Sequence, residues 1–201
     1  SDSNRWRVGL VGLWMDADER GGGGHAHGTA GAGTRFTGDS NLVIADLVWK
    51  WAPGGNYRSR NFTFTGEYFH REEDGDLLFS EGGSSADLVY DGTQQGFYVQ
   101  GIYQFMPRWR AGLRYDWLDS DNDVRITRLG GLDANEVMDE VGLSDAAENP
   151  ERWSIMADYA PSEFSRLRLQ YSHDDSRDGA ADHQWTLQYI MSLGAHGAHE
   201  Y

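Results

Sequence analysis

The chain has 201 residues, contains no cysteine and carries a formal net charge of −15. The absence of cysteine excludes disulfides, thiolate metal sites and a cysteine nucleophile, and the negative charge argues against binding to a nucleic-acid backbone, which needs a basic surface. No run of about 18 apolar residues is present, so the sequence offers no membrane-spanning helix.

Apolar and polar residues instead alternate in eight successive segments, each about ten residues long, the length of a tilted membrane-spanning strand. Because successive side chains of a strand point to opposite faces, each segment predicts a strand with one apolar face. In chain order, these faces are formed by Trp6, Val8, Leu10 and Trp14; Val43, Ala45, Leu47, Trp49 and Trp51; Phe62, Phe64 and Tyr68; Phe97, Val99, Tyr103 and Phe105; Trp109, Ala111, Leu113, Tyr115 and Trp117; Trp153, Ile155, Ala157 and Tyr159; Leu167, Leu169 and Tyr171; and Trp185, Leu187, Tyr189, Met191 and Leu193.

The predicted connections alternate between long and short. Long loops are predicted over residues 17–40, 72–95 and 118–151, with a medium loop over 174–182, and short turns at Pro53, Met106–Pro107 and Pro161–Ser162. The segment Asn135–Val141 could form a short helix within the longest loop. A soluble sandwich also alternates, but aromatic residues at strand ends and short turns on one side are typical of outer-membrane barrels.

The sequence therefore predicts an all-β fold: a transmembrane antiparallel up-and-down β-barrel of eight strands, in a single domain over residues 1–201. The short turns would be periplasmic, and the long acidic loops would be extracellular. Tyr201 lies an even number of residues after Met191 and Leu193, so it would share the last apolar face. It resembles the terminal aromatic signal read by the barrel-assembly machinery. The first residues lack the features of a signal peptide, which predicts a mature form or a fragment.

Charged residues gather on the opposite, inward faces of the predicted strands. Two interpretations stay open: ion pairs that pack a narrow barrel, or a charged lining that sets the ion selectivity of a pore. The residues of this predicted lining are Arg7, Asp46, Glu67, Arg110, Arg114, Asp116, Arg152, Asp158, Arg166 and Arg168.

Metal binding is a further hypothesis. His25 and His27 lie in the glycine-rich first loop, and imidazoles near carboxylates suit zinc or copper. The acidic stretch from Glu72 to Asp91 contains no Lys or Arg, so it is interpreted either as a solvated surface or as a negative vestibule that concentrates cations. The segment 119–123 resembles part of a calcium loop but lacks its glycine and its last acidic ligand, which leaves only weak calcium binding.

Catalysis is not expected. No Gly-x-Ser-x-Gly elbow and no His-Glu-x-x-His zinc motif occurs, and these are the local patterns that would mark a hydrolase site.

Three runs, over residues 97–110, 161–171 and 188–199, resemble the C-terminal half of porin-like bacterial outer-membrane proteins. Members of that family are described as zinc-regulated, TonB-dependent receptor-like or phosphate-selective-porin-like. They carry further strands before the point that matches Ser1, so the resemblance implies a fragment or a shortened relative. No plug or energy-coupling box, which a TonB-gated receptor needs, is visible in this sequence.

The expected function is that of an outer-membrane porin-like channel for passive passage of small solutes or ions, with metal cations as one option. The alternative is a small closed eight-stranded barrel with a structural or surface-binding role, because eight strands enclose only a narrow interior. The expected partners are outer-membrane lipid, lipopolysaccharide and the barrel-assembly machinery, and no nucleic acid.

Overall fold

A computed structural model describes residues 3–22, 33–143, 149–176 and 180–192. These residues form one eight-stranded antiparallel sheet in which each strand pairs with its neighbour in sequence. The elements are β1 (Asn4–Gly22), β2 (Gly33–Trp51), the short 3-10 helix η1 (Pro53–Gly55), β3 (Asn61–Glu81), β4 (Ser84–Met106), β5 (Trp109–Arg128), α1 (Ala134–Val141), β6 (Glu151–Ser162), β7 (Ser165–Asp175) and β8 (Asp182–Met191). The predicted all-β, antiparallel, up-and-down order of eight strands is confirmed.

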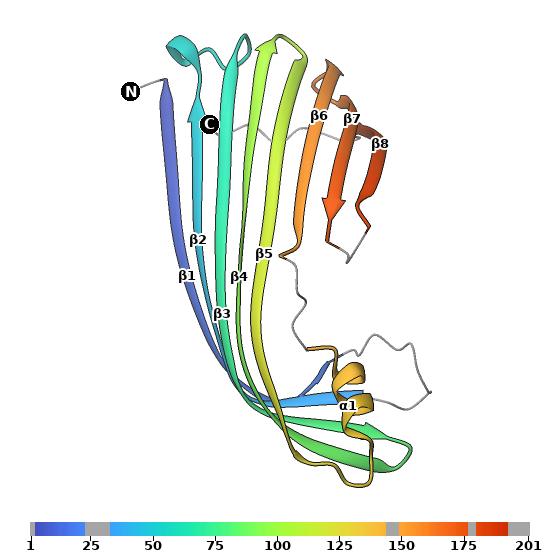
Figure 1. Cartoon of the computed structure of the whole chain (residues 1–201). Helices are drawn as coiled ribbons and strands as arrows, with labels where there is room; N and C mark the ends of the chain where they lie inside the picture. The colour runs from blue at the N-terminus through green and yellow to red at the C-terminus, as the bar shows by residue number, and fades with distance from the viewer. Residues whose placement is uncertain (1–2, 23–32, 144–148, 177–179, 193–201) are drawn as a thin grey trace.

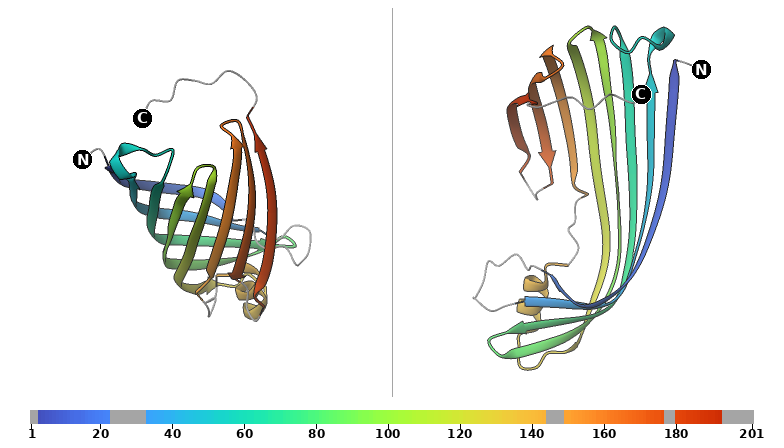
Figure 2. Two further views of the ribbon diagram at one scale, coloured as in Figure 1. Left: turned by 90° about the horizontal axis from the view of Figure 1, so that it is seen from above. Right: turned by 180° about the vertical axis from the view of Figure 1, so that it is seen from behind.

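The sheet is curved but open. Seen from above, it forms an arc with β1 at one edge and β8 at the other (Figure 2). Among the described residues these two edges do not pair, so the closure of the predicted barrel is not seen. The single described α-helix is too short and too polar to cross a bilayer.

The strands differ in length, which corrects the predicted loops. Strands β1 to β5 have 19 to 23 residues, whereas β6 to β8 have 10 to 12. The predicted long acidic loop over 72–95 is wrong: these residues continue β3 and β4 as a hairpin with the turn Gly82–Gly83. Most of the predicted loop 17–40 is likewise strand, and β5 continues to Arg128 before α1. The three predicted short turns do connect neighbouring strands.

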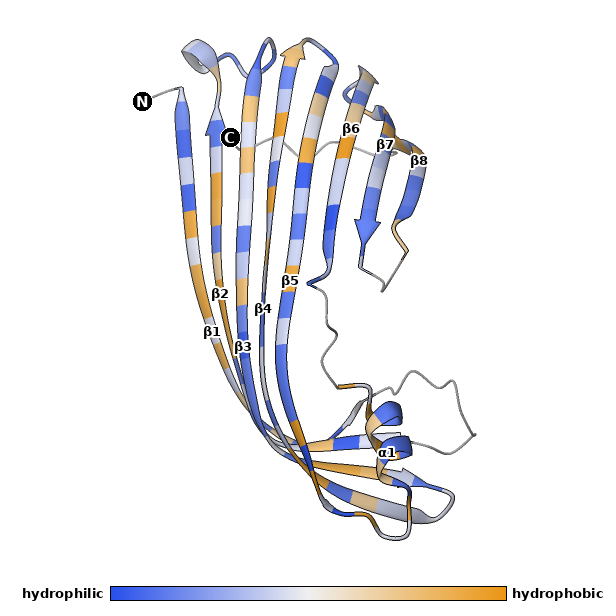
Figure 3. Ribbon diagram, viewed as in Figure 1, coloured by the Kyte–Doolittle hydropathy of each residue, from blue (hydrophilic) through white to orange (hydrophobic). Residues whose placement is uncertain are grey.

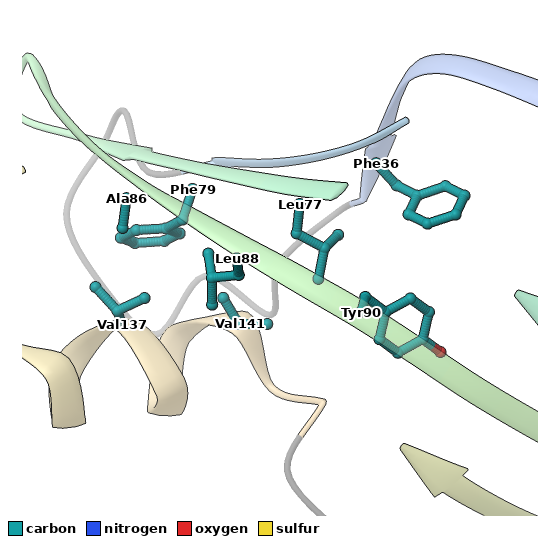
Figure 4. Packing of buried hydrophobic residues seen from close by; sticks show 8 residues of the cluster. All are labelled: Phe36, Leu77, Phe79, Ala86, Leu88, Tyr90, Val137 and Val141. Carbon is teal, nitrogen blue, oxygen red and sulfur yellow. The ribbon is translucent and has the colours of Figure 1, made fainter. Parts of the chain in front are cut away.

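The lengthened ends of β1 to β5 curl over the concave side of the sheet and carry α1 (Figure 1). We call this part the cap; it comprises residues 17–22, 33–38, 75–92 and 122–143. Apolar side chains from four elements meet inside it and are at most 9% exposed (Figure 4). This core consists of Phe36, Leu77, Phe79, Ala86, Leu88, Tyr90, Val137 and Val141.

The apolar face of the strands changes sides where the cap begins. In β3, Tyr68 is on the convex face, and nine residues later Leu77 is on the concave face. Figure 3 shows hydrophobic residues both in the upper part of these strands and in the cap, with mostly hydrophilic stretches of β3 and β4 between them. The alternation is interrupted by the polar run 70–76 in β3, and the apolar residues resume after it on the other face. They therefore lie on the concave face in the cap and on the convex face in the rest of the sheet, which we call the wall.

A pair of glycines allows the strands to bend at this point. Gly38 in β2 pairs with Gly75 in β3, and a Cβ added to Gly38 would lie 2.3 Å from the carbonyl oxygen of Asp74. A Cβ added to Gly75 would lie equally close, 2.3 Å from the carbonyl oxygen of Thr37. Glycine inside a strand typically marks such a close approach of two backbones at a bend.

The helix α1 closes the cap from the concave side. Asp133 caps its N-terminus by accepting hydrogen bonds from the backbone N–H groups of Asn135 and Glu136, and Gly142 ends it in a left-handed conformation. Val137 and Val141 lie four residues apart, on one face of the helix, and both pack into the cap core. The predicted short helix is confirmed; its packing into a core was not predicted.

Candidate functional site

The ten predicted lining residues all lie on the concave face of the sheet. The pairing register shows this directly, because Asp46 is opposite Glu67, Asp116 is opposite Arg152, and Asp158 lies between Arg110 and Arg168. Residues opposite one another in a sheet point to the same face. This face is therefore polar along β5 to β8, and guanidinium groups are its most frequent charges.

Asp158 is the centre of one charge cluster. Its carboxylate is 1% exposed and accepts hydrogen bonds from Arg168, 2.8 Å from Nε and 3.0 Å from Nη2. Arg110 and Arg166 approach the same carboxylate at 3.6 and 3.8 Å. Burial of a carboxylate is costly unless it is paired and hydrogen-bonded, and Arg168 supplies that pairing.

A second charge cluster on the concave face is centred on Arg114 and Asp116 of β5. Arg114 donates from Nε to both carboxylate oxygens of Asp116 at 2.9 Å, within the same strand. Its guanidinium also lies 4.0 Å from the ring centre of Tyr98, whose hydroxyl donates to Glu67 at 2.8 Å. Among the remaining lining residues, Arg7 pairs with Asp46 at 3.3 Å and Arg152 with Asp174 at 3.6 Å.

The convex face has the opposite character. Large aliphatic side chains are widely exposed there, including Leu10 at 76%, Leu187 at 72% and Ile155 at 57%. Aromatic contacts run along both borders of this apolar band. Near the short turns, the neighbouring pairs are Trp6–Trp49, Trp49–Phe62 and Trp109–Tyr159; toward the other end, they are Phe97–Trp117, Tyr115–Trp153 and Tyr171–Trp185.

A buried ion network joins the wall to the cap. The Glu73 side chain, 3% exposed, lies 2.8 Å from Arg20 and 3.5 Å from Arg71 and accepts a hydrogen bond from Ser40 at 2.7 Å. Burial alone would raise the pKa of Glu73, but these hydrogen bonds and charges outweigh it and leave the pKa below the usual value. Sequence reasoning missed this network because Glu73 was counted among the loop acids.

Acid is expected to loosen this joint. Since the folded-state pKa of Glu73 is lowered, its stabilising contribution is complete above its ordinary pKa and is lost as pH falls through the folded value. Protection factors from amide exchange, measured across residues 33–40 and 75–92 at pH 6 and pH 3, should fall at the lower pH. Glu73→Gln should show lower protection at pH 6 and a smaller further loss.

The control for this measurement is Glu72→Gln, since the Glu72 side chain is 64% exposed on the outer face beside His70. It should keep the acid response of the parent chain. An identical acid response in Glu73→Gln would contradict the assignment of Glu73 as the titrating group of the joint.

The predicted metal ligands are not brought together in the described part of the chain. His25 and His27 lie outside the described residues, as does Tyr201. Across the described ranges, no group of three or more histidine, aspartate or glutamate side chains is arranged to hold a metal ion. Zinc binding through His25 and His27 stays a prediction, and so does weak calcium binding.

Other histidines lie at the border of the apolar band that is away from the short turns. His173 and His183 lie side by side on β7 and β8 with ring centres 5.0 Å apart, and the Tyr171 hydroxyl lies 2.7 Å from Nδ1 of His183.

Of the acidic residues predicted to form a vestibule, Glu72, Asp74 and Asp76 lie on the outer face of the strands, because Glu73 between them faces inward.

Comparisons with known proteins add one distant relative. No family model and no solved structure matches the chain. The chain is similar to an uncharacterized protein of Aquifex aeolicus (strain VF5), with 25% identity over 172 residues, which covers 83% of this chain and 32% of that protein. The chain thus spans about a third of the length of the curated relative that it matches. The resemblance to porin-like proteins stays a prediction.

Proposed function

We propose that this chain forms a wall of a bacterial outer-membrane β-barrel whose concave face lines a passive channel for small solutes or ions. One observation carries the proposal: the two faces of the sheet have inverted polarity compared with a soluble protein. Leu10, Ile155 and Leu187 are exposed on the convex face, whereas the charges around Asp158 lie on the concave face. An outward apolar band bordered by aromatic residues, with a polar interior, is the pattern of membrane barrels.

The charges of the wall bear on which ions would pass. Metal cations were suggested by the acidic stretch 72–91, but Glu72, Asp74 and Asp76 would face the surroundings of the cap and not the channel. Arginines dominate the concave face of β5 to β8, and rings or rows of charged side chains set ion preference in pores. The proposed wall therefore supports passage of anions better than passage of metal cations.

The eight strands and the folded cap also support the alternative of a small closed barrel with a surface-binding role. Eight strands closed on themselves leave an interior that side chains just fill. Such a barrel would present the cap, with its buried core and acidic outer face, as its working surface. The two candidates differ in one measurable property, the presence of water along the concave face.

The absence of cysteine makes this test direct, because a single introduced cysteine would be the only thiol. Gln170→Cys places it on the concave face and Leu169→Cys on the convex face of the same strand, β7. In lipid bilayers, a charged methanethiosulfonate should modify Gln170→Cys and reduce single-channel conductance, and it should leave Leu169→Cys unmodified. Steady conductance steps from the unmodified chain are the accompanying expectation.

Silence from protein that is shown to be folded, with neither thiol modified, would contradict the channel and favour the closed barrel. Rapid modification of Leu169→Cys in the bilayer would contradict both, because the convex face would then lie in water.

A further inference from the structure

A hollow of about 520 Å³ lies on the concave side at the short-turn end of β4 to β8. Its lining combines three arginines, Arg108, Arg110 and Arg166, with apolar residues that include Phe164 and Ile190. Arg110 and Arg166 were predicted among the inward charges, but Arg108 and Phe164 belong to turns that the sequence analysis treated only as connections.

Arg110 and Arg166 contact the Asp158 carboxylate less closely than Arg168 does. Asp158 uses both carboxylate oxygens for Arg168. The contacts from Arg110 and Arg166 to Asp158, at 3.6 and 3.8 Å, exceed the length of a good hydrogen bond. Nε of Arg166 is buried and has no hydrogen-bond partner.

The local charge balance is positive. Four arginines at and behind the hollow, at positions 108, 110, 166 and 168, face the two carboxylates of Asp158 and Glu163, which leaves an excess of two positive charges. Guanidinium groups bind carboxylates and phosphates through paired, charge-assisted hydrogen bonds. An anion in the hollow would give Arg110 and Arg166 a closer partner than Asp158 does.

The apolar part of the hollow limits the kind of anion. Ile190 is the direct cross-strand partner of Arg166, so an aliphatic side chain lies next to the guanidinium. Ala160, Pro161 and Phe164 extend this apolar surface. A site that combines charged groups with an apolar surface orients a molecule by its charged end and packs its body against the apolar part.

We infer that the hollow binds an organic carboxylate with an apolar body, with the carboxylate at Arg110 and Arg166 and the body against Ile190 and Phe164. The inference names a solute class for the proposed channel and rests on that function only for how solutes reach the hollow. Binding itself requires only the folded chain, so it is tested without conductance.

Benzoate is the probe, measured by saturation-transfer NMR and calorimetry with the full chain folded in a neutral detergent. Benzyl alcohol has the same ring without the charge, and inorganic phosphate has charge without an apolar body. Benzoate should bind more tightly than either. The double variant Arg110→Gln with Arg166→Gln should weaken benzoate binding by about tenfold or more. The reason is that a contact between a guanidinium and a carboxylate contributes more binding free energy than an ordinary hydrogen bond.

Two further variants separate binding from folding. Arg7→Gln removes a 74% exposed arginine of the concave face of β1 and should leave benzoate binding unchanged. Ile190→Thr keeps every arginine and should weaken benzoate several-fold while leaving acetate unaffected. Each variant is compared only after strand content by circular dichroism matches that of the parent chain.

Equal or tighter binding of phosphate would overturn the organic-carboxylate assignment, and so would equal binding of benzyl alcohol. Unchanged benzoate affinity in the arginine double variant would overturn the site. If the unmodified chain shows no conductance in bilayers but still binds benzoate, the proposed channel is contradicted and the proposed binding site is not.

Discussion

The substitution Leu187→Arg is expected to lower the free energy of unfolding in lipid vesicles by about 2–4 kcal/mol, the cost of an arginine near the bilayer midplane of a barrel. Leu187 lies on the convex face of β8 between Trp185 and Tyr189, and it is 72% exposed in the isolated chain. In a water-soluble sheet, a change at so exposed a position would alter stability by no more than about 0.5 kcal/mol. The substitution therefore distinguishes a lipid-facing surface from a solvent-facing one.

The neighbouring residue provides the matched control. Gln188 pairs with Arg168 on the concave face, so Gln188→Arg adds the same charge one position away but toward the polar side. Its effect should stay within about 1 kcal/mol. Urea titrations in phosphatidylcholine vesicles, followed by tryptophan fluorescence, measure both variants. A neutral Leu187→Arg would contradict the membrane orientation proposed for the convex face.

The second large effect is expected in the cap. Phe79 is 1% exposed in the cap core beside α1 (Figure 4), and Phe79→Ala should cost about 3–5 kcal/mol because it leaves a cavity among tightly packed neighbours. The loss should appear as local opening, since the core of the cap is formed within β2 to β4 and α1. Amide exchange over residues 75–92 and 134–141 should speed up by about tenfold for each 1.4 kcal/mol lost.

The adjacent residue again serves as the control. Leu78 points to the other face of β3 and is only half-buried, so Leu78→Ala should cost less than about 1.5 kcal/mol. Strands β6 to β8 should exchange at the parent rate in both variants. An equal loss of protection in β6 to β8 after Phe79→Ala would show that the cap does not open as a separate unit.

Much of the fold was predictable because strand alternation is a local signal. Segments such as 109–117 and 153–159 have clear apolar and polar faces, and Pro107 lies in a turn of the structure while Pro161 lies two residues before one. The cap was missed for a reason that is also physical. The prediction followed one apolar face and stopped at the polar runs 70–76 and 91–96, beyond which Leu77, Phe79, Leu88 and Tyr90 form a second alternation on the opposite face.

The candidate site was predictable only to the level of a shared face. The alternation along β6 predicted that Asp158 lies on the inward face, since side chains two residues apart on a strand point the same way. The alternation does not give the distances between side chains on different strands. It could not show that Arg168 takes both oxygens of Asp158 while Arg110 and Arg166 approach that carboxylate only to 3.6 and 3.8 Å.

The amino-acid sequence by itself determined the number and order of the strands, the positions of the short turns and the residues that share each face, because these depend on period two and on turn chemistry. The tertiary structure alone decided the bend at Gly38 and Gly75, the cap folded over the concave side, and the arginine-lined hollow beside Ile190. These features depend on strand register and sheet curvature, which bring together residues far apart in the chain.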